Sequence, residues 1–409
     1  MPKKSETPIN HDHARGGVRS PTPSSSSSSL VLGFSGGPTQ RNRGRRTRDE
    51  DEDEAGHRAS GFLRILAFGF RLCLCWCACL EYSLPAQSAD FSHGLAPRTR
   101  VVIVQDAEAT KAFKPRWDKV LALVDSGITS FTGKTSVGEA WKTLVSTQDT
   151  VGIKVYSAPG GNSGTRPSVA AGVISGLLQA GVPPQQIIIW DKQWSDLRRA
   201  GFVDLAGRYG VRVSSSATAG YDETAFYENA LLGQPVWSDL EFKRKGAGVG
   251  RKSFVSKLVT KEMTRIINVT PLLNHNTAGV CGNLYSLALG SVDNTIRFES
   301  DSARLATAIP EIYALPILGD RVVLNIVDAL ICQYQGEQRS LLHYSTSLNE
   351  LHFSTDPVAL DVLSLQELNR QRKAAKMSVV TNSFDLYHNA SLVEIGVSNL
   401  KNINVETVR

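Results

Sequence analysis

The chain has 409 residues, of which 41% are hydrophobic and 21% charged, so it can bury one large core or two ordinary cores. Its 45 basic and 39 acidic residues leave a net charge of +6, which is small for this length, and no nucleic-acid-binding motif accompanies it. The composition therefore argues against a nucleic-acid-binding protein and favours a small-molecule partner.

Residues 1–60 have the composition of a disordered tail. They contain a serine run at 24–29, an arginine cluster at 41–48 and an acidic run at 49–54. Neighbouring blocks of opposite charge stay solvated and do not pack. Met1 is the only methionine before Met263, so a later translation start is an open alternative.

Residues 61–89 are predicted to be a signal peptide or a membrane anchor. The stretch 62–80 is strongly apolar but short for a membrane span, and small residues follow it, as at a secretory cleavage site. Cleavage after Ser88 is expected, and an uncleaved anchor and a lipoprotein acylated at Cys79 are the alternatives. The protein is therefore expected to be exported to the periplasm or secreted, with membrane contact only through 62–80 if that stretch is retained.

The folded part is predicted over 98–409 as an α/β domain with a mostly parallel sheet built from βαβ units. A strand beginning at Val151, a helix stopping at Gly181 and a buried strand at 187–190 have the spacing of one such unit. A division into two lobes is left open. Asp191 follows the second strand, where it either faces a ligand site or caps a helix or turn.

The loop after the first of these strands is the strongest candidate site. Its glycines let backbone N–H groups approach a ligand, and a helix begun at Pro167 points its N-terminus at an anion. A hydroxyl and two cationic side chains would complete a grip on a carboxylate or phosphate. The predicted ligand-binding residues here are Lys154, Gly160, Gly161, Gly164, Thr165 and Arg166. The alternative is a flexible connection, since the loop matches neither the dinucleotide-binding nor the P-loop fingerprint.

A second candidate site surrounds His275, which directly follows a predicted strand. Its imidazole can transfer a proton, bind a metal or only hold the loop. Asp191 and Asp328, both at strand ends, are the candidates to orient it, and Asn276 is a predicted ligand-binding residue. No second histidine or cysteine lies at ligand spacing, which argues against a dedicated metal site, and the cofactor stays unknown.

Three other segments carry simpler predictions. Asp356 followed by Pro357 is typical of a helix N-cap with proline in the first turn. Residues 403–408 are expected to form a last strand at a sheet edge. The basic, glycine-rich segment at 243–252 is either a lid over an anion or a solvated turn.

Several of these segments together resemble the family catalogued as domain of unknown function 362. The shared marks, in chain order, are GIKV at 152–155, TRP at 165–167, AGVPP at 180–184, IIIWD at 187–191, LNHNTAG at 273–279, LALGSVDN at 287–294, IVDA at 326–329 and STDPVALD at 354–361. The resemblance implies an α/β fold and, for many relatives, export. Some relatives carry ferredoxin-type clusters, but this chain lacks the C-x-x-C-x-x-C run, so no iron–sulfur cluster is expected.

The chain also departs from that family. Relatives often carry lysines where this chain has Asn274 and Tyr285, and an asparagine where it has Tyr156. Chemistry that depends on those lysines is therefore in doubt. A weaker local similarity links the segment around 165–167 to the nickel-pincer lactate racemases, whose equivalent loop engages cofactor and substrate.

Two hypotheses about function follow. In the first, an exported enzyme acts on a small carboxylated or phosphorylated molecule that Arg166 and the glycine loop hold, while His275 transfers a proton. In the second, the same loop captures an anion without catalysis. Both predict that Lys154, Arg166, His275 and Asp328 converge in one pocket, and a structural or partner-binding role is the third alternative.

Overall fold

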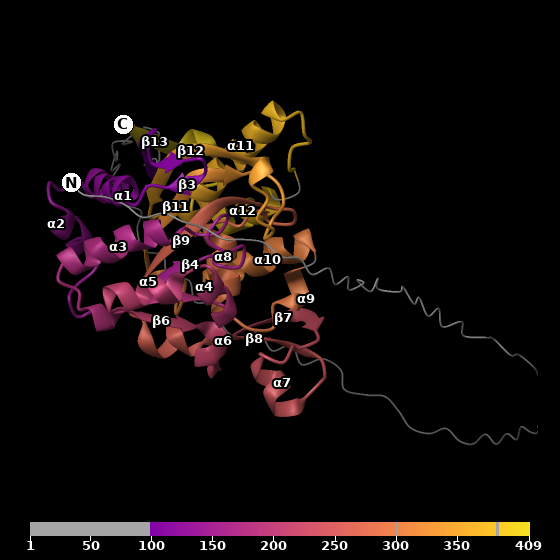
Figure 1. Cartoon of the computed structure of the whole chain (residues 1–409). Helices are drawn as coiled ribbons and strands as arrows, with labels where there is room; N and C mark the ends of the chain where they lie inside the picture. The colour runs from indigo at the N-terminus through magenta and orange to yellow at the C-terminus, as the bar shows by residue number, and fades with distance from the viewer. Residues whose placement is uncertain (1–98, 300, 382–383) are drawn as a thin grey trace, which may run out of the picture. The chain divides into compact units, whose positions relative to one another are not determined.

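In the computed structural model, which describes residues 99–299, 301–381 and 384–409, a nine-stranded sheet forms the centre of the molecule (Figure 1). Across the sheet the order is β13 (Ile403–Val408), β1 (Thr99–Gln105), β12 (Ser345–Ser354), β11 (Val322–Gln333), β9 (Arg265–His275), β4 (Val151–Val155), β5 (Ile187–Asp191) and β6 (Arg212–Ser215), with β10 (Gly279–Val280) paired to β9. Only β12 and β10 run antiparallel to their neighbours within this described sheet. The predicted α/β class with a mostly parallel sheet is confirmed.

Helices cover both faces of the sheet, and successive residues of one strand enter different cores. Ile187 and Ile189 of β5 belong to one buried cluster, and Ile188 and Trp190 belong to the other. This burial on both faces is typical of parallel strands and explains the unbroken apolar run in the sequence. The first cluster includes side chains of α1 (Trp117–Thr132), α2 (Val137–Lys142), α3 (Pro167–Gln179) and α5 (Phe202–Tyr209). The second includes side chains of α8 (Asn283–Ser291), α10 (Ser302–Tyr313), α11 (Pro357–Ala374) and α12 (Phe384–Leu392).

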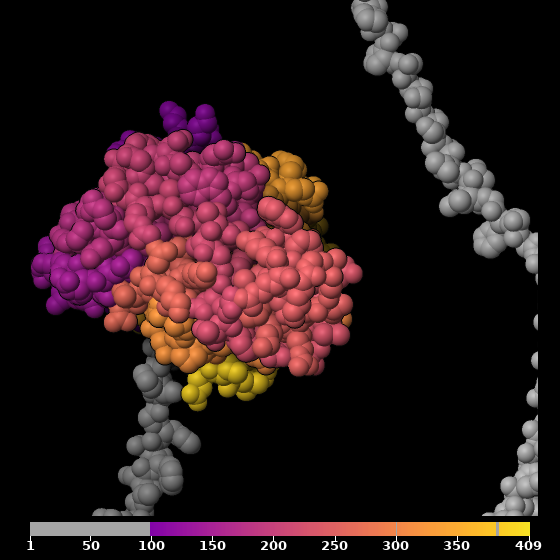
Figure 2. Space-filling view, turned by 90° about the horizontal axis from the view of Figure 1, so that it is seen from below, coloured from indigo at the N-terminus to yellow at the C-terminus, as the bar shows by residue number. Residues whose placement is uncertain are grey.

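The remaining elements are short or belong to a separate hairpin. The short ones are β2 (Thr110–Lys111), β3 (Lys114–Pro115), α4 (Trp194–Arg199), α6 (Ser216–Ala219) and α9 (Ile296–Glu299), with single helical turns at Pro184–Gln186, Leu258–Glu262, Gly319–Arg321, Leu342–Tyr344 and Leu400–Asn402. The hairpin consists of β7 (Tyr221–Gly233) and β8 (Gly250–Ser256), with α7 (Leu240–Lys245) between them. In Figure 2 the hairpin, in salmon, occupies much of the visible face.

A buried carboxylate ties this hairpin to the end of α8. Asp293 accepts hydrogen bonds from the backbone N–H groups of Phe254, at 2.6 Å, and Leu240, at 2.8 Å. Burial raises the pKa of Asp293 to about 6, although these bonds favour its charged form. The basic segment 243–252 spans the last turn of α7 and the start of β8, and its role as a lid stays a prediction.

Several local predictions are confirmed. β4, α3 and β5 form the predicted βαβ unit, with α3 ending at Gln179. Asp356 is the N-cap of α11, since its Oδ1 accepts from the N–H of Ala359 at 2.9 Å, and Pro357 occupies the first turn. β13 lies at the edge of the sheet, as expected for the last strand.

The sheet reverses its order beside β4, which lies between β5 and β9. The chain runs outward from β4 to β5 and β6, and later resumes at β9 on the other side of β4. Ligands of open α/β sheets bind at such switch points, outside the carboxyl ends of the strands. The predicted site residues Lys154 and Asp191 lie in the strands that end at this edge.

The predictions for residues 1–60 and 61–89 lie outside the described residues. Within the part that the structure describes, no helix is both long and apolar enough to cross a membrane. Cys281 and Cys332 are buried free thiols.

Candidate functional site

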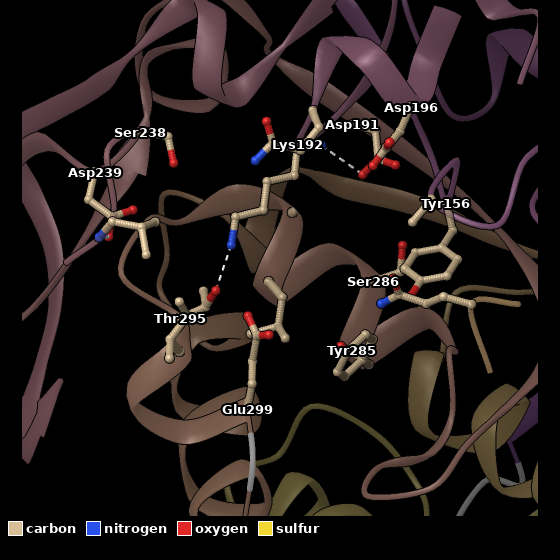
Figure 3. A pocket seen from close by; sticks show the side chains of 17 residues that line it. Tyr156, Asp191, Lys192, Asp196, Ser238, Asp239, Tyr285, Ser286, Thr295 and Glu299 are labelled. Atoms are coloured by element: carbon tan, nitrogen blue, oxygen red, sulfur yellow. Dashed lines mark hydrogen bonds between the residues drawn. The ribbon is translucent and has the colours of Figure 1, made fainter. Parts of the chain in front are cut away.

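A cavity of about 280 Å³ opens at the carboxyl ends of β4 and β5 (Figure 3). Side chains from the β4–α3 loop, the end of β5, the segment before α7, and α8 and α9 surround it. Its charged lining residues are Asp191, Lys192, Asp196, Asp239 and Glu299. The cavity therefore lies where ligands of such sheets commonly bind, and both acidic and basic side chains line it.

Asp191 is the most heavily hydrogen-bonded carboxylate of this cavity. Its Oδ2 accepts from the N–H and the hydroxyl of Ser157, at 2.8 and 2.6 Å. Its Oδ1 accepts from the Lys154 ammonium and from the backbone N–H of Lys192, both at 2.8 Å. Asp191 thus caps the turns after β4 and β5, as one interpretation predicts. It also lines the cavity, and its role toward a ligand stays a prediction.

Lys154 lies fully buried behind the cavity wall. Its Nζ donates to the carbonyl of Val155 at 2.8 Å, to Asp191, and to Oγ of Ser286 in α8 at 3.0 Å. Burial lowers the pKa of Lys154, and the neighbouring Asp191 opposes that shift. Gly290 of α8 makes room for this lysine, because a Cβ there would lie 2.3 Å from Cε of Lys154.

Lys192 is the cation that the sequence analysis did not single out. It is half-buried, crosses the cavity in Figure 3, and donates from Nζ to Oγ1 of Thr295 at 2.6 Å. No described carboxylate forms an ion pair with it. Burial lowers the pKa of Lys192, while Glu299 and Asp239 act in the opposite direction. An ammonium with two remaining N–H groups therefore faces the cavity.

Arg166 and Thr165, in contrast, are satisfied by other parts of the protein. The Arg166 guanidinium donates to Oδ1 of Asp328, and its backbone N–H donates to Oδ2, both at 2.9 Å. The side chains of Arg166 and Asp328 are both buried. The Thr165 hydroxyl donates to the carbonyl of Val269 at 2.7 Å. The carboxylate of Asp328 thus occupies the N-terminus of α3, where an anionic ligand was expected.

The glycines of this loop serve the fold of the loop itself. Gly160 has φ +80°, which favours glycine, and its N–H donates to Ser157 at 2.9 Å. A Cβ at Gly164 would lie 2.5 Å from the carbonyl oxygen of Tyr156, and one at Gly161 would lie 3.3 Å from that of Ala200. Close approach to the protein's own backbone therefore accounts for Gly164, and positive φ accounts for Gly160.

His275 is held by its own loop. Its Nδ1 accepts from the N–H groups of Thr277, at 3.2 Å, and Ala278, at 3.0 Å, so Nε2 carries the proton when the ring is neutral. The ring lies 4.3 Å from the ring of Tyr285, which lines the cavity. Burial lowers the pKa of His275. Asn276 is exposed, and its N–H donates to the Glu337 carboxylate at 2.7 Å.

The four residues expected to share one pocket do not line this cavity. Arg166 and Asp328 pair with each other, and Lys154 contacts Asp191 from behind the wall. His275 contacts the ring of Tyr285, which lines the cavity, but does not line it itself. Of the predicted site residues only Asp191 lines it. The expected convergence is therefore not observed at this cavity, and the catalytic and ligand-binding roles stay predictions.

Sequence reasoning missed the side chains that complete the cavity. Lys192 had a usable signal, since it directly follows Asp191 at the end of a predicted buried strand. Tyr285 and Ser286 come from α8, and Glu299 from α9, and no local pattern connects them to β4 or β5. Among the described residues there is no group of three or more His, Cys, Asp or Glu side chains placed to hold a metal ion.

Comparison with known proteins places the chain in a family. No curated protein matches it. A crystal structure of a Thermotoga maritima protein from the Northeast Structural Genomics Consortium aligns with 62% of this chain and 59% of its own length, at 9% identity and a TM-score of 0.34. The family model described as Domain of unknown function (DUF362) matches residues 151–366, just over half of the 409 residues. The chain therefore belongs to the DUF362 family.

Proposed function

We propose that the protein binds a small carboxylated or phosphorylated molecule in this cavity, and that Lys192 is the cation that holds its anionic group. The observation that carries the proposal is the pairing of cations at this edge of the sheet. The side chains of Lys154 and Arg166 each have a carboxylate partner, whereas the ammonium of Lys192 donates only to a hydroxyl among the described residues. The carboxylates near Lys192 act on it only over a distance, so its two remaining N–H groups can donate to the anionic group of a ligand.

The opposite wall of the cavity suggests what else the ligand carries. The carboxylate of Glu299 lines the cavity and accepts no hydrogen bond from any described side chain. Asp196 and Asp239 are different, since Asp196 accepts from Arg199 at 2.9 Å and Asp239 accepts from the N–H of Val236 at 2.6 Å. A ligand with both an anionic group and a hydroxyl or ammonium group, such as a small hydroxy acid, would match Lys192 and Glu299 together.

A ligand screen by thermal unfolding tests the proposal. Inorganic phosphate, L-lactate and related small acids are added to the wild type, to Lys192→Met and to Lys134→Met, a control at an exposed lysine. At a concentration 100-fold above its Kd, a ligand should stabilise the wild type by about 2.7 kcal/mol, or raise Tm by about 5 °C. Lys192→Met should lose this shift and Lys134→Met should keep it. An equal shift in all three proteins, or none in the wild type across the screen, would contradict the proposal.

Export is a separate part of the proposal, and the composition of residues 61–89 supports it. Expression of the full chain in a bacterial host, followed by fractionation and intact mass measurement, tests it. Cleavage after Ser88 predicts a soluble product that begins at Ala89, an anchor predicts the full mass in the membrane, and lipidation at Cys79 predicts an acylated mass. A full-length product that stays in the cytoplasm would exclude all three.

A further inference from the structure

Ser286 is the hydroxyl of this cavity that lies beside a buried amine. It belongs to α8, lines the cavity in Figure 3, and accepts a hydrogen bond from Nζ of Lys154 at 3.0 Å. Its side chain is almost fully buried, so the cavity is its route to a small molecule. No described residue accepts the hydroxyl proton of Ser286, which leaves its oxygen able to react once that proton is removed.

The fold holds the Lys154 amine in place through specific contacts. Asp191 and the carbonyl of Val155 each accept from Nζ of Lys154 at 2.8 Å, and Gly290 lets the lysine lie against α8. The charged groups facing this amine are Asp191, which favours its protonated form, and Lys192, which disfavours it. Burial disfavours the protonated form further, and a buried lysine in its neutral form is a competent general base.

We propose that Ser286 is the nucleophile of an acyl-transfer reaction, with Lys154 as its general base and Asp191 as the residue that positions the lysine. The proposal rests on the proposed function, because the cavity must admit a small molecule whose anionic group Lys192 holds. Nucleophile, base and orienting carboxylate within hydrogen-bond distance are the general arrangement of covalent catalysis. The substrate class is a small carboxylic ester that carries an anionic group for Lys192.

The reaction balances with water as the second reactant. Oγ of Ser286 forms a bond to the ester carbonyl carbon while its proton moves to Nζ of Lys154. The carbon–oxygen bond to the alcohol then breaks, and the alcohol leaves with that proton. Water attacks the acyl-serine, its proton passes to the same amine, and Ser286 recovers a proton as the acid is released. The net change is ester plus water giving acid plus alcohol.

A serine-directed fluorophosphonate probe tests the nucleophile on the full chain. Wild type, Ser286→Ala and Ser238→Ala are incubated with the probe, and the adduct is located by intact mass and peptide mapping. Ser238 lines the same cavity but accepts no hydrogen bond from a lysine of the described residues, so it is the matched control. We expect one adduct at Ser286, lost in Ser286→Ala and kept in Ser238→Ala. No adduct at Ser286, or equal labelling of Ser286→Ala, would overturn the proposal.

The role of Lys154 has its own measurements. In Lys154→Met, with folding checked by circular dichroism, labelling of Ser286 should slow at least tenfold, and equal labelling would contradict the role of the base. In the wild type, the labelling rate of Ser286 should rise with pH to a plateau as Lys154 loses its proton. A rate independent of pH would contradict the role of Lys154 as the base. If the probe fails while lactate or phosphate still stabilises the wild type through Lys192, acyl transfer is wrong and the binding function stands.

Discussion

Two cationic side chains at one edge of the sheet, Arg166 and Lys192, differ in the groups that they bond to. Arg166 follows β4 and is buried against Asp328, which takes both its guanidinium and its backbone N–H. Lys192 follows β5 and reaches into a cavity, where a threonine hydroxyl is its partner among the described residues. The glycine-rich loop after β4 is therefore held by the Asp328 carboxylate of the protein itself. Lys192, which no sequence motif marks, faces the cavity instead.

The largest expected effect on stability comes from breaking the buried pair of Arg166 and Asp328. Arg166→Met leaves the Asp328 carboxylate buried without its partner, which costs about 3–5 kcal/mol in unfolding free energy. The control is Arg370→Met, since Arg370 pairs with Glu367 at 2.7 Å on the surface, where such pairs contribute about 0–1 kcal/mol. Denaturant unfolding of both variants measures the difference. Equal losses would mean that the Arg166 pair does not hold the loop.

Alanine substitutions at two glycines test how closely α8 packs against Lys154 beside the cavity. Gly290→Ala forces a Cβ against Lys154 and should destabilise by about 1–3 kcal/mol, as overpacking does. Gly207 of α5 is the control, because a Cβ there meets nothing within 4 Å, and alanine should stabilise that helix by about 0.5–1 kcal/mol. Changes of the same sign and size in thermal unfolding would show that Lys154 does not fill the space beside Gly290.

A loss of stability in the same range is expected at His275, with little change in ligand binding. His275→Ala leaves the N–H groups of Thr277 and Ala278 without their acceptor and should cost about 1–3 kcal/mol of stability. Because the imidazole does not line the cavity, the affinity for a small acid should change less than twofold. Calorimetric titration of the variant measures this. A tenfold loss of affinity would instead support the direct role for His275 that the sequence motif predicts.

The charge state of Lys192 predicts a pH dependence. An anion binds to the protonated amine, and burial lowers the pKa of Lys192 below the usual 10.5 of a lysine, although nearby carboxylates oppose this. The affinity for lactate, whose own charge is constant above neutrality, should therefore fall as the pH rises, and before pH 10.5 is reached. An affinity that stays constant to pH 10.5 would show that Lys192 does not bind the anion.

The fold was predictable from sequence because its signals are local. The apolar run of β5, the proline that starts α3 and the Asp356 cap of α11 each depend on a few adjacent residues. The pairing of charges is different, because it depends on residues that only the fold brings together. Arg166 and Asp328 are separated by 162 positions, and Lys192 and Thr295 by 103.

The same reasoning explains which residues at this edge of the sheet the sequence singled out. Asp191 and Lys154 were identified because they stand in strands at predictable positions of a βαβ unit. Their mutual bond, and their contact with Ser286, could not be predicted, because nothing local places α8 against β4. The sequence thus indicated the edge of the sheet where the cavity lies, while the identity of the cation that faces this cavity required the tertiary structure.

The most direct measurement compares the two cations in binding. Calorimetric titration of the wild type, Lys192→Met and Arg166→Lys with the small acid that most stabilises the wild type gives three affinities under one condition. We predict at least a tenfold loss for Lys192→Met and less than a twofold change for Arg166→Lys, which keeps the charge beside Asp328. The reverse result would show that the glycine loop, and not the cavity beside Lys192, binds the ligand.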